Sequence, residues 1–205
     1  MNTLLWVVMK GVCGIAFWHG QITNFGLNTN GLMMMNDHNK RYLNVYFTQT
    51  EYDICRYIGE MRYKITAQHV PDNRQDATQD PMQMCVDGVL TEYAVAKTLN
   101  LSFDLNCNFR QFGADLTTRD GKPLEVKSTK TVGGNLNAVK GSAGKPAAFF
   151  VLTEIHSSHV RIVGWIGRER FLHPDNLKDI GRGSFYSVPQ TSLVPFDEKY
   201  YKETL

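Results

Sequence analysis

The stretch GADLTTRDGKPLEVKST (residues 113–129) combines a hairpin pattern with charged side chains inside the strands. Two short runs flank a central Asp-Gly pair, which is a strong local indication of a β-hairpin. Asp115, Glu125 and Lys127 lie in those runs, where a half-buried strand usually carries β-branched or aromatic residues. The direction of these three side chains therefore determines whether the hairpin is a solvated surface or a chemical site.

The length of the turn decides which side chains share a face of the hairpin. A two-residue loop would put Asp115 and Glu125 on opposite faces, because side chains alternate along a strand. A three-residue loop, with Gly121 in the left-handed position, pairs Leu116 with Leu124 and brings the two carboxylates opposite each other. We favour the three-residue loop because it pairs two leucines on one face, which then becomes the core face.

In the favoured register, Asp115, Glu125 and Lys127 share one face of the hairpin, and leucine and valine side chains line the other. Two carboxylates directly opposite each other have Cβ atoms about 5 Å apart, and their like charges are destabilising without compensation. A hard divalent cation compensates them, because carboxylate oxygens are its preferred ligands. Lys127 would stand beside this ion, where it can orient a water molecule or stabilise charge that develops on a phosphate.

Two helices are expected before the hairpin. The first is predicted over residues 50–68, where apolar side chains recur at helical spacing: Ile54, Tyr57, Ile58, Met61 and Ile65. The second begins with Asp80 as its N-cap and Pro81 in the first turn. Gln83 completes a capping box, and the helix is expected to end near Leu99.

Two apolar strands are expected after the hairpin. The run PAAFFVLTEI (residues 146–155) is almost unbroken, which is typical of a strand buried on both faces, and VRIVGWIG (residues 160–167) returns as another strand. The tail is expected to form a short helix, an irregular segment and a closing strand or helix. This order predicts an α/β or α+β fold in which helices cover a mixed central sheet.

The 205 residues, with 42% hydrophobic and 20% charged side chains, are those of a globular protein with one core and an appendage. Residues 1–34 are a poorly assigned extension, and translation starting at a methionine within 33–35 is an alternative. The apolar run in this extension contains Lys10, is too short to span a bilayer and lacks the features of a signal peptide. We assign residues 35–80 to an N-terminal helical segment with a connector, and residues 81–205 to the core.

The charges are unevenly distributed, although the net charge is only +2. Residues 110–145 contain seven Lys or Arg and three acids, whereas residues 72–92 contain five acids and one Arg, so a basic region surrounds the hairpin. The four cysteines are scattered, which gives no zinc or disulfide pattern and indicates buried thiols in a reducing, cytoplasmic setting. The histidines show no zinc-binding spacing, and we interpret them as surface or turn residues.

Asp115, followed after nine residues by Glu125-Val126-Lys127, resembles the signature of the PD-(D/E)XK nucleases, with Ala114 at the position of the proline in that name. The stretch GVLTEYAVAKTLN (residues 88–100) is similar to the first core helix of this family. FYSVPQTSLVPF, near the C-terminus, resembles the closing segment of its small, often phage-borne members. The resemblance covers roughly residues 82–196.

The first core helix of the family often carries a glutamate that supports the metal site, and Glu92 occupies the matching position. Glu92 shares a helix face with Val89 and Ala96, so its carboxylate is expected on the packed side. A buried carboxylate needs a partner, which a metal ion or a basic neighbour would provide. The alternative is a surface acid near Lys97.

The resemblance implies a restriction-endonuclease-like fold and a Mg²⁺-dependent endonuclease that hydrolyses DNA phosphodiester bonds. Asp115, Glu125 and the Val126 carbonyl would hold Mg²⁺, for which Mn²⁺ is a possible substitute. Lys127 would act on the water or the phosphate, and Glu92 would orient a second ion or a metal-bound water. Members of this family commonly act as dimers, so we expect a homodimer as well as DNA as partners, and no membrane.

Three lysines after the hairpin, Lys130, Lys140 and Lys145, are expected to contact DNA phosphates, because the stretch that holds them contains no acids. The alternative for these three is a solvated loop. For the hairpin as a whole, one alternative is a surface salt bridge between Lys127 and a carboxylate. For the protein, the alternative is a non-catalytic nucleic-acid-binding or interaction module that retains the nuclease fold.

Overall fold

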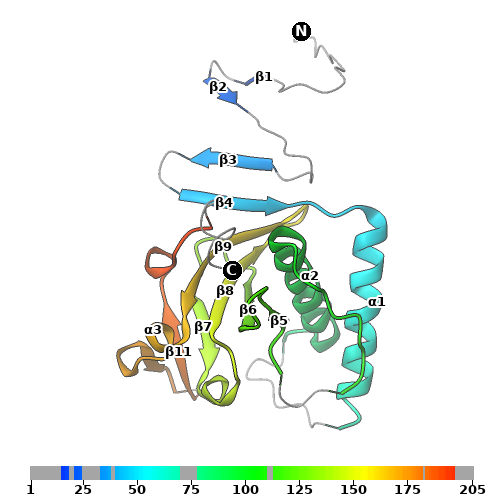
Figure 1. Cartoon of the computed structure of the whole chain (residues 1–205), viewed down its shortest axis with the longest axis vertical. Helices are drawn as coiled ribbons and strands as arrows, with labels where there is room; N and C mark the ends of the chain where they lie inside the picture. The colour runs from blue at the N-terminus through cyan, green and yellow to red at the C-terminus, as the bar shows by residue number, and fades with distance from the viewer. Residues whose placement is uncertain are drawn as a thin grey trace.

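A mixed sheet of six strands lies at the centre of the structure (Figure 1). The computed structural model of the chain describes residues 15–18, 21–24, 33–37, 40–69, 78–109, 113–181 and 183–196. The order across the sheet is β3 (Met33–Asp37), β4 (Lys40–Val45), β9 (Val160–Gly167), β8 (Phe149–Ile155), β6 (Pro123–Thr129) and β5 (Leu116–Thr117). β6 and β8 are parallel, and the other neighbours are antiparallel. The predicted α/β class with a mixed central sheet is confirmed.

Helix α2 (Pro81–Leu99) covers one face of this sheet (Figure 1). It begins at the N-cap Asp80 and ends at Asn100, which adopts a left-handed conformation with φ of 52°. Gln83 does not complete the predicted capping box, because its side-chain amide donates to Asp87. The helix packs on the sheet through a cluster that includes Ala94, Val95, Leu99, Leu116, Leu124 and Val126.

Helix α1 (Gln49–Thr66) packs on the outer side of α2 (Figure 1). The side chains of Thr48 and Glu51 cap its N-terminus in a reciprocal capping box. Its buried face contains Cys55 and Ile58, whereas Tyr57 is exposed. The buried face of the helix is therefore rotated by part of a turn from the apolar face that the sequence predicted. In the described part of the chain, no helix is long and apolar enough to cross a membrane.

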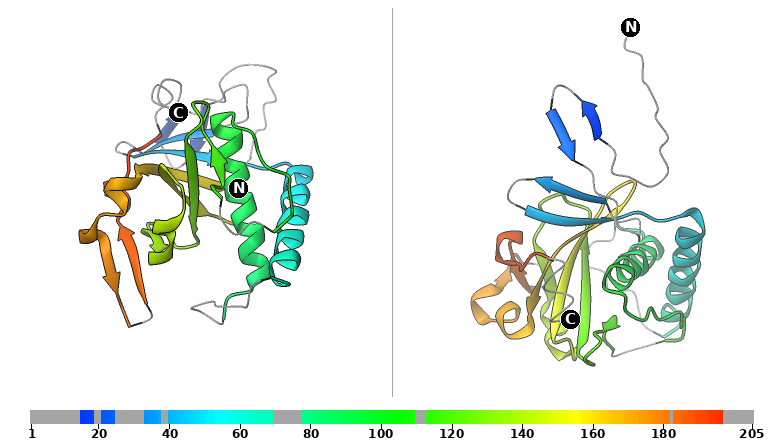
Figure 2. Two further views of the ribbon diagram at one scale, coloured as in Figure 1. Left: turned by 60° about the horizontal axis from the view of Figure 1, so that its bottom comes forward. Right: turned by 45° about the horizontal axis from the view of Figure 1, so that its top comes forward.

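The other face of the central sheet is covered mainly by strands (Figure 2). A second sheet has the order β10 (Leu177–Asp179), β11 (Ser184–Val188) and β7 (Leu136–Val139). The short helix α3 (Arg168–Phe171) and 3-10 turns at Lys140–Gly144, Pro174–Asn176 and Gln190–Ser192 accompany it. The sequence predicted helices around the central sheet, but long helices lie on only one of its faces.

Two described segments before residue 67, β4 and α1, belong to the same layers as the rest of the described chain. β4 pairs with β9 in the central sheet, and α1 packs on α2, so the segment that the sequence analysis assigned to residues 35–80 is joined to the core. Before it, β1 (Ile15–Trp18) and β2 (Gln21–Asn24) form a two-stranded antiparallel sheet. The rest of the extension, most of the predicted connector and residues after 196 lie outside the described residues.

Two glycines in the helices test the packing of α1 on α2. A Cβ atom at Gly59 would lie 2.6 Å from the Cα of Val86, whereas a Cβ at Gly88 would meet no atom within 4 Å. We expect Gly59→Ala to lower the free energy of unfolding by about 1–3 kcal/mol through overpacking. Gly88→Ala should raise it by up to about 1 kcal/mol through helix propensity. Urea unfolding measures both, and equal effects of the two substitutions would contradict this packing.

Candidate active site

The hairpin has the predicted three-residue loop. Leu116 pairs with Leu124, and Gly121 has a φ of 82°, which is the left-handed conformation that the loop requires. The amide of Thr118 donates to the carbonyl of Lys122 at 2.9 Å, which closes the loop. The register that pairs the two leucines is therefore confirmed, and Asp115 lies directly before β5, outside the paired residues.

The two faces of β6 have different neighbours. Leu124 and Val126 point to the α2 side, where they belong to the cluster under that helix. Glu125 and Lys127 point to the opposite side, because side chains alternate along a strand. The expected division of the hairpin into an apolar and a charged face is thus present, and the charged face lies away from α2.

Glu125 is fully buried, and its two carboxylate oxygens have different environments. Oε1 accepts hydrogen bonds from Lys127 Nζ at 2.6 Å and from Lys145 Nζ at 2.5 Å. Oε2 is buried and has no hydrogen-bond partner among the described residues. A buried carboxylate oxygen without a partner carries a desolvation penalty, so this atom is suited to a cation that approaches it.

Asp115 lies at the start of the hairpin and reaches the same group of charges. Its Oδ2 accepts a hydrogen bond from the Val126 amide at 2.8 Å, which fixes the carboxylate against β6. Burial and the neighbouring charge of Glu125 raise the pKa of Asp115, although Lys145 partly opposes them. Asp115 also lines a cleft of about 160 Å³ together with Arg62 and Lys145, through which solvent reaches the site.

Lys145 follows the 3-10 turn after β7, and its ammonium points inward to Glu125. Arg168 holds this segment in place by donating to the carbonyls of Lys145, at 2.7 Å, and of Ala143. Burial favours the neutral form of Lys145, but the hydrogen bond and charge of Glu125 outweigh burial and raise its pKa. The ammonium that the sequence analysis assigned to DNA phosphates therefore contacts a site carboxylate, and it stays charged at neutral pH.

Glu92 extends from α2 and has a basic partner. Its Oε2 lies 2.8 Å from Arg62 Nη1 of α1, and Arg62 also donates to the carbonyls of Asp104 and Asn106. The charge of Glu92 contributes to the raised pKa of Lys145, which places the carboxylate in the electrostatic surroundings of the site. The alternative was a surface acid near Lys97, but only 15% of the Glu92 side chain is exposed, and the Lys97 ammonium contacts Glu51.

The other two predicted phosphate contacts, Lys130 and Lys140, differ from Lys145. Lys130 Nζ forms an ion pair of 2.6 Å with Asp87 of α2, and 64% of its side chain remains exposed. Lys140 is exposed at the start of the 3-10 turn that leads to Lys145. DNA contact by these two lysines stays a prediction.

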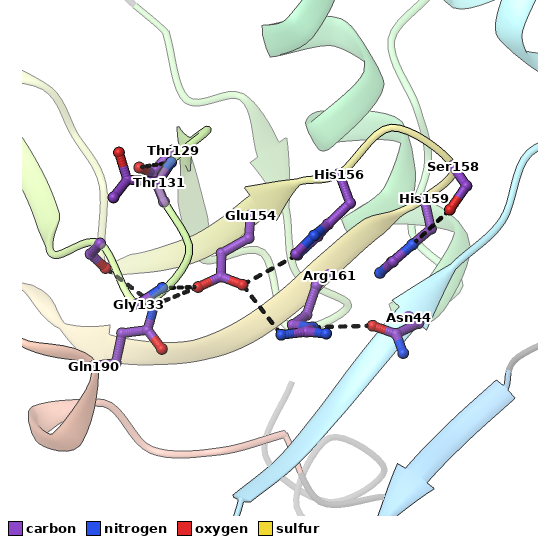
Figure 3. Close-up of polar contacts among 11 residues, drawn as sticks. Asn44, Thr129, Thr131, Gly133, Glu154, His156, Ser158, His159, Arg161 and Gln190 are labelled. Carbon is purple, nitrogen blue, oxygen red and sulfur yellow. Dashed lines mark hydrogen bonds and ion pairs between the residues drawn. The ribbon is translucent and has the colours of Figure 1, made fainter. Parts of the chain in front are cut away.

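A second buried carboxylate, Glu154, was not singled out in the sequence. It lies on β8 next to the end of β6, and it accepts hydrogen bonds from the Gly133 amide at 2.8 Å and the Gln190 side chain at 2.7 Å (Figure 3). His156 and Arg161 lie on its other side. Burial raises the pKa of Glu154, but the hydrogen bonds from Gln190 and Gly133 outweigh it and lower the pKa. The only indication in the sequence was a single charge within an apolar strand.

The oxygen donors of the hairpin suit a hard cation, although there are few of them. It offers two carboxylates and the backbone carbonyl of Val126, and oxygen ligands of this kind suit Mg²⁺ and Mn²⁺. In the described part of the chain, no group of three or more His, Cys, Asp or Glu side chains is arranged to hold a metal ion. The partnerless oxygen of Glu125 is the feature that fits a cation here.

Comparisons of the chain with protein-family models, with curated proteins and with solved structures give no match in any of the three.

The raised pKa of Asp115 leads to a prediction about stability without metal. A carboxyl group whose pKa rises on folding destabilises the folded state above its unfolded-state pKa of about 3.9. Asp115→Asn should therefore raise the free energy of unfolding at pH 7 in EDTA, and the gain should disappear well below pH 4.

Asp120, in the same hairpin, is the matched control. Hydrogen bonds from Lys122 and Thr118 lower the pKa of Asp120, so its carboxylate stabilises the folded state above the unfolded-state pKa. Asp120→Asn should lower stability at pH 7. Denaturant unfolding between pH 3 and pH 8 measures both substitutions, and a loss of stability with Asp115→Asn at pH 7 would refute the buried acid pair.

Proposed function

We propose that the chain is a Mg²⁺-dependent endonuclease that hydrolyses DNA phosphodiester bonds through a PD-(D/E)XK site on a restriction-endonuclease-like fold. The observation that carries this proposal is the grouping of Asp115, Glu125 and Lys127. The charge of Glu125 raises the pKa of Asp115, the Lys127 ammonium contacts Glu125, and the second oxygen of Glu125 is buried without a partner among the described residues. An acid pair of this kind is destabilising by itself. Its presence at the open edge of a sheet is consistent with a catalytic role.

Asp115, Glu125 and the Val126 carbonyl would hold the ion, with Mn²⁺ as a possible substitute for Mg²⁺. When bound, such an ion lowers the pKa of a coordinated water and polarises a phosphate oxygen. The Val126 amide orients Asp115 through its hydrogen bond. The Arg62 ion pair holds the Glu92 carboxylate, which would orient a second ion or a coordinated water.

The two ammonium groups on Glu125 supply the positive charge of the site. Lys127 is positioned on β6 by the strand itself, and Lys145 by the hydrogen bonds of Arg168 to the preceding turn. Fixed cations close to a reacting phosphate stabilise the charge that develops in the transition state. Lys145 lines a cleft together with Asp115, and a phosphate bound in this cleft would contact its ammonium. Lys130 and Lys140 would contact DNA farther out, and a homodimer is part of the proposal.

The rival function is a non-catalytic nucleic-acid-binding or interaction module, and one observation favours it. Lys127 and Lys145 already neutralise Glu125 within the protein, which is also what a purely structural ion cluster requires. A buried cluster of this kind is costly to break by removing one partner, whatever its role. Catalysis must therefore be tested directly.

The direct test is cleavage of supercoiled plasmid and of a branched DNA by the wild-type protein and by Lys127→Ala, with Mg²⁺ or with EDTA. We expect cleavage by the wild type in Mg²⁺ alone, and a reduction of about 100-fold or more in the variant, because a fixed cation at the reacting phosphate is lost. Lys122→Ala is the matched control, because Lys122 lies in the hairpin turn and pairs with the exposed Asp120.

Two results would contradict the proposed activity. Equal cleavage by Lys127→Ala and the wild type, with both proteins folded, would remove Lys127 from the mechanism. Binding of DNA without cleavage in any metal would establish the non-catalytic module instead. Circular dichroism of each variant confirms that it is folded.

A further inference from the structure

A second cleft, of about 420 Å³, lies away from the carboxylate pair. It is bordered by the start of α1, the first half of α2 and the turn between β8 and β9. The residues that define its chemistry are Phe47, Tyr52, Gln83, Lys130, His156 and His159. A volume of this size lies within the range of small-ligand sites.

Rings form much of the wall of this cleft. Phe47 and Tyr52 contribute from the α1 side, and 38% of Tyr52 is exposed. His156 and His159, in the turn after β8, stack with ring centroids 4.5 Å apart and planes only 5° from parallel (Figure 3). Walls of this kind favour a flat aromatic ligand, because ring faces stack on one another.

The hydrogen-bonding groups of the cleft include one that is unsatisfied. Nε2 of His159 is buried and has no hydrogen-bond partner among the described residues, whereas its Nδ1 lies 3.1 Å from the Ser158 hydroxyl. Burial, together with His156 and Arg161, lowers the pKa of His159, so the ring is neutral at pH 7. A neutral imidazole nitrogen can donate or accept one further hydrogen bond, depending on the tautomer.

The charges in the cleft are balanced. Asp87 accepts from Gln83 at 2.8 Å through Oδ1 and pairs with Lys130 at 2.6 Å through Oδ2. The acid and the lysine cancel each other, which makes the interior a poor site for an isolated anion. The cleft instead suits a neutral, planar ligand with a hydrogen-bonding edge. Its rings can stack on such a ligand, its amide and imidazole groups can bond to the edge, and its charges are balanced.

We propose that this cleft binds a nucleobase. The base would stack against the rings of Tyr52 and the histidine turn, and its edge would bond to His159 and Gln83. Lys130, at the rim of the cleft, would lie beside the attached phosphate. The ligand is either a free nucleotide or an unpaired base of a DNA strand, and this inference does not depend on the nuclease activity.

The test uses fluorescence of single-stranded oligonucleotides that contain one 2-aminopurine, with the full chain in EDTA so that no cleavage is required. The other arms are unlabelled competitors of this binding: a strand of the same length without bases, and deoxyadenosine monophosphate. We expect a fluorescence change on binding and weaker binding of the abasic strand. Tyr52→Ala and His159→Ala should each weaken binding about tenfold, since stacking on one base is worth about that factor.

Tyr57→Ala is the matched control, because Tyr57 is an exposed tyrosine of the same helix that does not line the cleft. Saturable binding of the monophosphate identifies a free nucleotide as ligand, and binding of the oligonucleotide alone identifies DNA. Either result supports the site when Tyr57→Ala leaves binding unchanged. Equal binding of the abasic strand, equal effects of Tyr52→Ala and Tyr57→Ala, or no binding in any arm would overturn it.

Discussion

The charge balance around the Glu125 carboxylate is the interaction on which the candidate site depends. Two ammonium groups contact one of its oxygens, the other oxygen has no partner among the described residues, and Asp115 adds a second, half-buried acid. Burying this much charge is costly unless the partners are fixed. β6 fixes Lys127, and Arg168 fixes the segment that carries Lys145. The site therefore depends on long-range packing as well as on the hairpin.

The hairpin register is the second requirement. Gly121 allows the left-handed conformation of the hairpin loop, and this loop pairs Leu116 with Leu124. Successive side chains of β6 therefore point alternately to α2 and to the charge cluster. A shift of one residue would expose the leucines and bury the charges on the wrong face. One glycine and one pair of leucines thus connect the core packing under α2 to the chemistry on the opposite side of the sheet.

Local patterns predicted the turn, the register, helix α2 and the two apolar strands, because these depend on capping, periodicity and turn chemistry within a few residues. The inward direction of Lys145 was not predictable, since its partner lies 20 residues earlier in the sequence. Glu154 was missed for the same reason: its strongest contact is with Gln190, 36 residues later. The exposed side of α1 was misjudged because its apolar residues surround much of the helix, and only the packing on α2 selects one face.

The most direct test of a cation site at the acid pair is calorimetric titration of Mn²⁺ into the wild-type protein and Asp115→Asn, without DNA. The substitution keeps the side chain's size, and the raised pKa of Asp115 predicts no loss of stability in the variant. A change in binding therefore reports on the ligand itself. We predict saturable binding to the wild type and its loss, or a weakening of at least about tenfold, in the variant. Equal binding by the two proteins, or no binding by the wild type, would contradict a cation site at this hairpin.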